Sequence, residues 1–194
     1  MTRAAEAKRV TKETEVTIRL RIEGDGVMKG GTGIAFFDHL LASMIKHSGF
    51  DLELNVRELV HVDDHHVVED VALVLGCALR KALGDKKGIM RFGHAIIPMD
   101  DSLSMVAIDL SGRPYLVFNA DFSRNDIGGM ALENIRHFFR SLATSSCSTI
   151  HALVLHGVND HHKAESLFKA LGVALREAVS LSGKGNIPSL KGVL

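Results

Sequence analysis

The stretches HVDDHHVVED (residues 61–70) and GVNDHHKAES (157–166) decide how the chain is organised. Valine, aspartate, two histidines and glutamate coincide at five of the ten positions, and the offset of 96 residues is about half of the 194-residue chain. Self-similarity at a fixed offset predicts structural repeats. We therefore expect one domain over residues 1–194, with repeats at about 10–92 and 93–185 and a C-terminal tail over 186–194.

The first half alternates between strand and helix patterns. Apolar residues at every second position are typical of a half-buried strand, and apolar residues three or four apart indicate an amphipathic helix. Aspartate favours a helix start, and glycine favours a helix end. These patterns predict strands over 15–22 and 50–57, a helix over 36–47 that ends before Gly49, and a helix from Asp63 or Asp64 to Gly84.

The second half follows the same scheme. Its last helix has Leu167, Leu171 and Leu175 at intervals of four residues, which gives it one apolar face. The patterns predict strands over 103–110, 114–121 and 148–156, and helices over 132–143 and 160–179. Each half is therefore expected to contain β-β-α-β-α, and together they predict an α+β fold with helices packed on one face of a mostly antiparallel sheet.

The paired histidines suit metal binding. Residues four apart share one face of a helix, so the first histidine of each pair and the following glutamate can chelate one ion. The second histidine lies about 100° further round the helix and should point to a different ion. We expect each ion to take the His-and-Glu pair of one helix and the second histidine of the other. The ligands in the two motifs are His65, His66, Glu69, His161, His162 and Glu165.

Two further histidines, His39 and His137, lie at matching places in the earlier helix of each half. They complete three imidazoles and one carboxylate per ion, a set that suits Mn, Fe, Zn, Co or Ni. The absence of sulfur ligands weakens the case for a structural zinc site. Lone histidines are more often surface or hydrogen-bonded residues, and we assign that role to His47, His94, His151 and His156.

Composition argues against several classes of protein. The 23 Lys and Arg residues balance 23 Asp and Glu residues, so a general nucleic-acid binder is not expected. Residues 1–16 are too polar for a signal peptide, and no apolar run approaches the roughly 20 residues that cross a bilayer, so we expect a cytoplasmic protein. Cys77 and Cys147 lie in apolar stretches outside any CxxC pair, which predicts buried free thiols.

Motifs along nearly the whole chain resemble the imidazoleglycerol-phosphate dehydratase family. They are RVTKETEV, FFDHLL, HVDDHHVVEDV, GIMRFGHAIIPMDDSL, SGRPYL, HFFRSLA, NDHHKAESLFKAL and PSLKGVL. The resemblance implies a hydro-lyase of histidine biosynthesis with a duplicated fold, similar to ribosomal protein S5 domain 2. It also implies a homo-oligomer of 24 subunits, with active sites at subunit interfaces and two Mn²⁺ ions, or other divalent transition metals, in each site.

The resemblance also implies residue roles. As metal ligands it implies His39, His65, His66, Glu69, His137, His161, His162 and Glu165. As substrate contacts it implies Glu13, His39, His65, Arg91, Arg113, Ser189 and Lys191. For the catalytic carboxylate, our first candidate is Glu13, because it matches a family substrate contact and is not a ligand, and Glu165 is the weaker candidate because it is committed to metal. Arginine, lysine and hydroxyl groups are the donors that a phosphate dianion needs. Leu190 and Asp101 depart from the family pattern, in which we expect Thr or Ser and Glu at those positions.

The implied reaction converts D-erythro-imidazoleglycerol phosphate to imidazole acetol phosphate. The proton that is lost lies beside no carbonyl, so the electrons must come from the substrate's own imidazole. A metal ion favours the deprotonated form of a group that it binds, so we expect a metal-stabilised imidazolate that expels the hydroxyl to give a diazafulvene. Loss of the neighbouring proton then yields an enol and finally the ketone.

Two other functions remain as alternatives. A binuclear metal hydrolase could use the same ligands to activate water, and it would cleave generic phosphoesters. A non-catalytic metal-binding or storage assembly would show metal-dependent oligomers, but it would leave Arg91, Arg113 and Lys191 without a task. Neither alternative predicts formation of imidazole acetol phosphate from the phosphorylated imidazole, and only the hydrolase predicts cleavage of generic phosphoesters.

Overall fold

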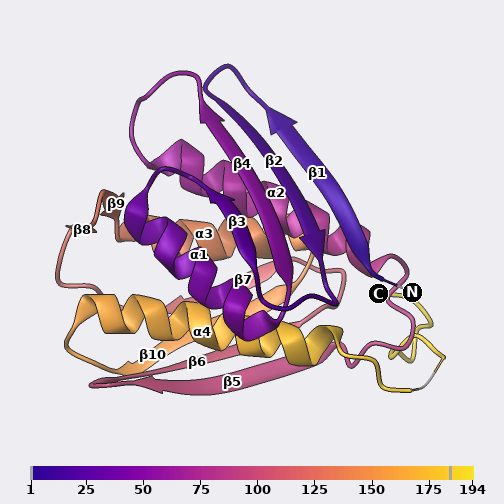
Figure 1. Ribbon diagram of the computed structural model, residues 1–194. Helices are drawn as coiled ribbons and strands as arrows, with labels where there is room; N and C mark the ends of the chain where they lie inside the picture. The colour runs from indigo at the N-terminus through magenta and orange to yellow at the C-terminus, as the bar shows by residue number, and fades with distance from the viewer. Residues whose placement is uncertain (1, 184) are drawn as a thin grey trace.

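The computed structural model describes residues 2–183 and 185–194, and Figure 1 shows its helices and strands. The first half contains β1 (Ala4–Val10), β2 (Thr14–Arg21), β3 (Met28–Gly31), α1 (Ala35–Ser48), β4 (Asp51–Glu58) and α2 (His65–Leu83). The second half contains β5 (Phe92–Met99), β6 (Ser102–Asp109), β7 (Tyr115–Asn119), β8 (Asp126–Ile127), β9 (Met130–Ala131), α3 (Glu133–Ser146), β10 (Thr149–His156) and α4 (Asp160–Val179).

The strands form two four-stranded mixed sheets and one short hairpin, β8–β9. The strand orders are β1-β2-β4-β3 and β5-β6-β10-β7. In each large sheet three strands are antiparallel, and the last strand pairs in parallel, β3 with β4 and β7 with β10. The predicted α+β class is confirmed, and the helices lie between two sheets rather than on a single one (Figure 1).

Glycines allow the helices of the two halves to pack closely, α2 against α3 and α1 against α4. A Cβ added at Gly76 would lie 2.7 Å from the amide nitrogen of Ser146, and one added at Gly172 would lie 2.4 Å from the carbonyl oxygen of Met44. Both distances are too short for a side chain. Gly76 and Gly172 are separated by the same 96 residues as the two histidine motifs, so the helix crossings are equivalent.

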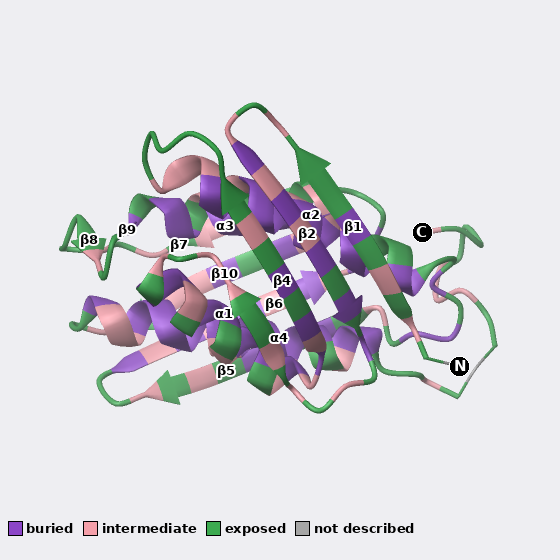
Figure 2. Cartoon of the chain, turned by 45° about the horizontal axis from the view of Figure 1, so that its top comes forward, coloured by how far each residue is buried: buried purple, intermediate pink, exposed green. Residues whose placement is uncertain are grey.

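Aromatic residues fill the core between the helices. The Phe37 and Phe138 ring centroids lie 5.6 Å apart, edge to face, and the Phe138 and Phe168 centroids lie 4.9 Å apart. All three rings are fully buried, and such contacts add to the stabilisation from apolar burial. Figure 2 shows that buried residues alternate with intermediate or exposed ones along β2 and along the first half of β4, as a strand that covers a core on one face requires.

The predicted strands and helices are present, but β1, β3, β5 and the β8–β9 hairpin were not predicted. In β1 the only buried residue is Ala7, and in β5 the buried residues are Gly93 and Ala95. Because α4 packs directly on β5, a Cβ at Gly93 would lie 2.0 Å from the carbonyl oxygen of Ala174. Small residues at the buried positions leave no alternation of large apolar side chains to detect.

The prediction for the cysteines was partly wrong. Cys77 and Cys147 are free, as expected, but each is half-buried rather than buried. Cys147 follows the end of α3 in a left-handed conformation, with φ of 53°, and its sulfur accepts an exposed hydrogen bond from Arg80 at 3.3 Å. Among the described residues, the helices are too short or too polar to cross a membrane.

Candidate metal and active site

The crossing of α1 and α4 brings together His39, His161 and Glu165. The Nε2 atoms of both histidines lie 3.2 Å from Glu165 Oε2, and one ligand atom from each residue lies within 4.8 Å of the others. His161 and Glu165 share a helix face because they are four residues apart. We call this group the α1/α4 cluster.

Glu165 is the most enclosed member of the α1/α4 cluster, with only 8% of its side chain exposed. Ser43 donates a hydrogen bond to its Oε1 at 3.1 Å, and Lys169 Nζ lies 3.0 Å from the same atom. Burial alone would raise the pKa of Glu165, but the hydrogen bonds from Lys169 and His39 outweigh it and lower the pKa to about 2. Glu165 is therefore a carboxylate at neutral pH.

A second group forms where α2 crosses α3, and we call it the α2/α3 cluster. It contains His65, Glu69 and His137, again with ligand atoms within 4.8 Å of one another. His137 Nε2 lies 3.1 Å from Glu69 Oε1. The rings of His65 and His137 have centroids 4.2 Å apart. The clusters are equivalent in the two halves, because each combines the HHxxE helix of one half with the earlier helix of the other.

A hydrogen-bond chain sets the tautomer of His65. Asn134 Nδ2 donates to Asp64 Oδ2 at 2.9 Å, so the Asn134 carbonyl oxygen faces His65 Nδ1, also at 2.9 Å. The Nδ1 atom must then carry the proton, and the lone pair of His65 is on Nε2, the atom left for a metal ion.

The second histidines, His66 and His162, join neither cluster. Their rings are almost perpendicular to those of His65 and His161, at 83° and 82°. The predicted combination with the His-and-Glu pair of the other helix does not form within the chain, because among the described residues each cluster contains only three possible ligands.

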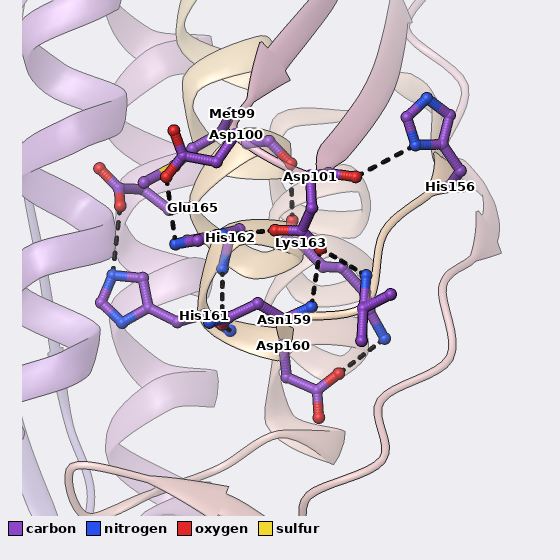
Figure 3. A network of polar contacts seen from close by, with 12 residues as sticks. Met99, Asp100, Asp101, His156, Asn159, Asp160, His161, His162, Lys163 and Glu165 are labelled. Carbon is purple, nitrogen blue, oxygen red and sulfur yellow. Dashed lines mark hydrogen bonds and ion pairs between the residues drawn. The ribbon is translucent and has the colours of Figure 1, made fainter.

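Each second histidine faces a carboxylate instead. His66 Nδ1 lies 2.9 Å from Glu13 Oε2, at ion-pair distance, but the angles do not make a hydrogen bond. His162 Nδ1 lies 2.5 Å from Asp101 Oδ1 and is hydrogen-bonded to it (Figure 3). Glu13 was predicted as a site residue. Asp101 was noted in the sequence only because it departs from the family pattern.

The predicted phosphate contacts lie elsewhere in the chain. Arg91 pairs with Asp109 at 2.7 Å and donates to the carbonyl oxygen of Pro188 at 2.9 Å, which holds the C-terminal tail next to Ser189. Lys191 lies in the same tail, and its amide donates to Ser189 Oγ at 3.2 Å. Arg113 is close to the end of that tail. A Cβ added at Gly112, the residue before it, would lie 2.6 Å from the carbonyl carbon of Leu194.

These contacts are far from the α1/α4 cluster. The amide of Arg91 donates to the carbonyl oxygen of Ala178 at 2.9 Å, near the C-terminal end of α4, whereas His161 lies in its first turn. At 1.5 Å per residue, the two positions are about 25 Å apart along the helix axis. One chain therefore holds the phosphate donors and the α1/α4 cluster at opposite ends of α4 (Figure 1).

Some site residues were missed in the sequence. Lys169 follows Glu165 by four residues, and that spacing alone could have indicated a pair. Asn134 contacts His65 across 69 positions of sequence, and only the crossing of α2 and α3 brings them together. No local pattern marks such a residue.

Comparisons with known proteins identify a family for this chain. The family model described as imidazoleglycerol-phosphate dehydratase matches residues 32–175. A relative of that name from Chlorobium chlorochromatii is 51% identical over 192 residues, covering 99% of this chain and 97% of the relative. One from Methanothermobacter thermautotrophicus is 54% identical over 186 residues, covering 96% and 95%.

Solved structures of the same name are also similar. The dehydratase from Staphylococcus aureus has a TM-score of 0.82 and 34% identity, covering 92% of this chain and 99% of that one. The enzyme from Pyrococcus furiosus, in complex with (S)-C348, has a TM-score of 0.83 and 35% identity, covering 96% and 99%.

Proposed function

This chain belongs to the imidazoleglycerol-phosphate dehydratase family, and from that premise we propose that its two clusters are parts of metal-dependent active sites shared between copies of the chain. The family's reaction is a dehydration in histidine biosynthesis, so the chain is a hydro-lyase. The observation that carries the proposal is the separation of the phosphate donors from the α1/α4 cluster along α4.

We propose two Mn²⁺ ions, or other divalent transition metals, in each active site. Each cluster offers two imidazoles and one carboxylate, a donor set that fits such an ion. One imidazole is missing from the expected set, and His66 and His162 of neighbouring copies are the residues left to supply it. When bound, the ions would supply Lewis acidity that favours the deprotonated form of the substrate's imidazole. The electron route through the substrate ring stays a prediction.

Glu13 is the stronger candidate for proton transfer. Its side chain is 42% exposed, and its carboxylate makes no hydrogen bond among the described residues, although one oxygen lies 2.9 Å from His66 Nδ1, so solvent and substrate can reach it. Glu165 is the weaker candidate, because Ser43 and Lys169 already occupy one of its oxygens and it is needed as a ligand. Proton transfer by a carboxylate within hydrogen-bond reach is the step that the chain itself must supply.

The phosphate of the substrate would be held by donors of a neighbouring copy. We assign this role to Arg91, Arg113, Ser189 and Lys191, which gather around the tail, and we keep His39 and His65 as contacts of the substrate as well as of the metal. The proposal includes a homo-oligomer of 24 copies, a cytoplasmic location, and one domain built from repeats at about 10–92 and 93–185 with the tail over 186–194. The equivalent strand orders of the two sheets support the repeats.

The activity is tested by product formation from imidazoleglycerol phosphate before chelation, after chelation, and with Mn²⁺ restored. We expect imidazole acetol phosphate only with metal. Release of inorganic phosphate from generic phosphoesters would favour the hydrolase instead, and a metallated oligomer that forms no product would favour storage.

The sharing of sites is tested by co-expressing two inactive variants, His161→Ala and Arg91→Ala. If one copy supplies the metal cluster and another the phosphate donors, some sites in the mixed oligomer contain an intact cluster and intact donors. We expect a fraction of wild-type turnover from the mixture and none from either variant alone. A mixture as inactive as its components would contradict shared sites.

A further inference from the structure

The two halves of the chain place a carboxylate beside the second histidine in the same way. Glu13 immediately precedes β2, and Asp101 immediately precedes β6, the equivalent strand of the other sheet. Both strands have eight residues and begin with a buried hydroxyl residue. The contacts are to the same ring atom, Nδ1 of His66 in one half and Nδ1 of His162 in the other.

Asp101 is held much more firmly than Glu13. Its Oδ2 accepts hydrogen bonds from the amides of Val158 at 2.6 Å and Asn159 at 2.9 Å, while its Oδ1 accepts from His162 (Figure 3). The side chain therefore connects the β5–β6 turn to the segment that enters α4. Asn159 in turn caps α4, because its Oδ1 accepts from the amide of His161. The carboxylate is fixed at the position where the histidine pair begins.

This contact determines which nitrogen of His162 remains available. An ionised carboxylate only accepts hydrogen bonds, so the Nδ1 atom beside Asp101 must be the donor. In a neutral imidazole the lone pair is then on Nε2, and a metal-binding histidine is commonly oriented by such a carboxylate. Asp100 Oδ2 lies 3.4 Å from Nε2, but the Asp100 side chain is 76% exposed and makes no hydrogen bond among the described residues, so an ion can displace it.

We propose that Asp101 is a positioning residue for His162, which fixes Nδ1 as the hydrogen-bond donor and presents Nε2 to a metal ion. The inference rests on the proposed function, because it takes His162 as a ligand. It also separates the roles of two equivalent carboxylates. Asp101 accepts two backbone amides and orients a ligand, whereas Glu13, whose carboxylate accepts no hydrogen bond among the described residues, is the one available to transfer a proton.

The test uses calorimetry to compare Mn²⁺ binding by chelator-treated wild-type and variant proteins. The visible spectrum of the Co²⁺-loaded proteins is a second readout. Loss of an outer-shell partner typically weakens metal affinity by about 10–100-fold, and we expect this for Asp101→Asn in about half of the ions bound. Asp101→Glu should restore the affinity to within a few-fold and restore the Co²⁺ spectrum. Asp101→Ser serves as a second variant if the Asn variant does not fold, because its hydroxyl can still accept from a backbone amide.

Asp51→Asn is the matched control. Asp51 Oδ1 also accepts two backbone amides, from Asp25 and Val27, but Asp51 lies in β4 of the other sheet and contacts no histidine among the described residues, so its loss should leave Mn²⁺ affinity unchanged. His162→Ala separates the two proposals. If His162→Ala binds Mn²⁺ like the wild type, His162 is not a ligand and the proposed function fails at this residue. If His162→Ala loses affinity but Asp101→Asn does not, the positioning role alone is refuted.

Discussion

Gly172→Ala should loosen the α1/α4 cluster by forcing two helices apart. The new Cβ would lie 2.4 Å from the carbonyl oxygen of Met44, whereas a close carbon–oxygen contact is about 3.3 Å, so α4 must move by about 0.9 Å from α1. The neighbour is backbone and cannot rotate away, so the strain should be near the upper end of the range for overpacking, about 3 kcal/mol. The higher helix propensity of alanine offsets about 1 kcal/mol of this strain, which leaves a net loss of about 2 kcal/mol in the free energy of unfolding.

The same movement separates His39 on α1 from His161 and Glu165 on α4. The midpoint of urea unfolding of the metal-free protein, at one fixed subunit concentration, measures the stability, and calorimetry measures Mn²⁺ affinity. Gly185→Ala is the control, because a Cβ there would have no described atom within 4 Å apart from its chain neighbours. If Gly172→Ala changes neither the urea midpoint nor the Mn²⁺ affinity, the α1/α4 crossing does not set the geometry of the cluster.

Three further predictions address proton transfer, metal release and acid stability. Glu13→Gln should abolish turnover while leaving metal content unchanged, and retained turnover would remove Glu13 from the mechanism. Acid should release the proposed metal ions and dissociate the proposed oligomer, because protons compete for the ligating imidazoles; an assembly that is still fully metallated near pH 4 would contradict this. The hydrogen bond from Arg21 lowers the pKa of Asp51 from 3.8 to about 2, so its stabilising contribution is complete above pH 3.8 and is lost as the pH falls through about 2. Asp51→Asn should therefore flatten the dependence of unfolding on pH in that interval, as measured by urea midpoints.

The sequence was sufficient for the elements whose signal is local. The four-residue spacing of His65 and Glu69 predicted a shared helix face, and the two residues do lie in one cluster. The leucines at 167, 171 and 175 predicted the buried face of α4, and all three are buried. In both cases the prediction needed only the helix period.

The features that the sequence did not predict depend on tertiary packing. Gly30 in β3 has φ of +81°, and a Cβ there would lie 1.8 Å from the carbonyl oxygen of Leu54, so the strand exists only because a glycine allows this pairing. Asp101 can be recognised as a partner of His162 only once the β5–β6 turn is seen against the start of α4. Neither feature leaves a periodic pattern in the sequence.

The straight run of α4 between its histidine end and its tail end limits how the chain can change during evolution. Inserting one residue between Glu165 and Ala178 would lengthen the helix by about 1.5 Å and rotate everything beyond it by about 100°, turning the Arg91 end away from its present direction. Relatives should therefore accommodate insertions and deletions in the turns between elements, and the length of this helix segment should be invariant.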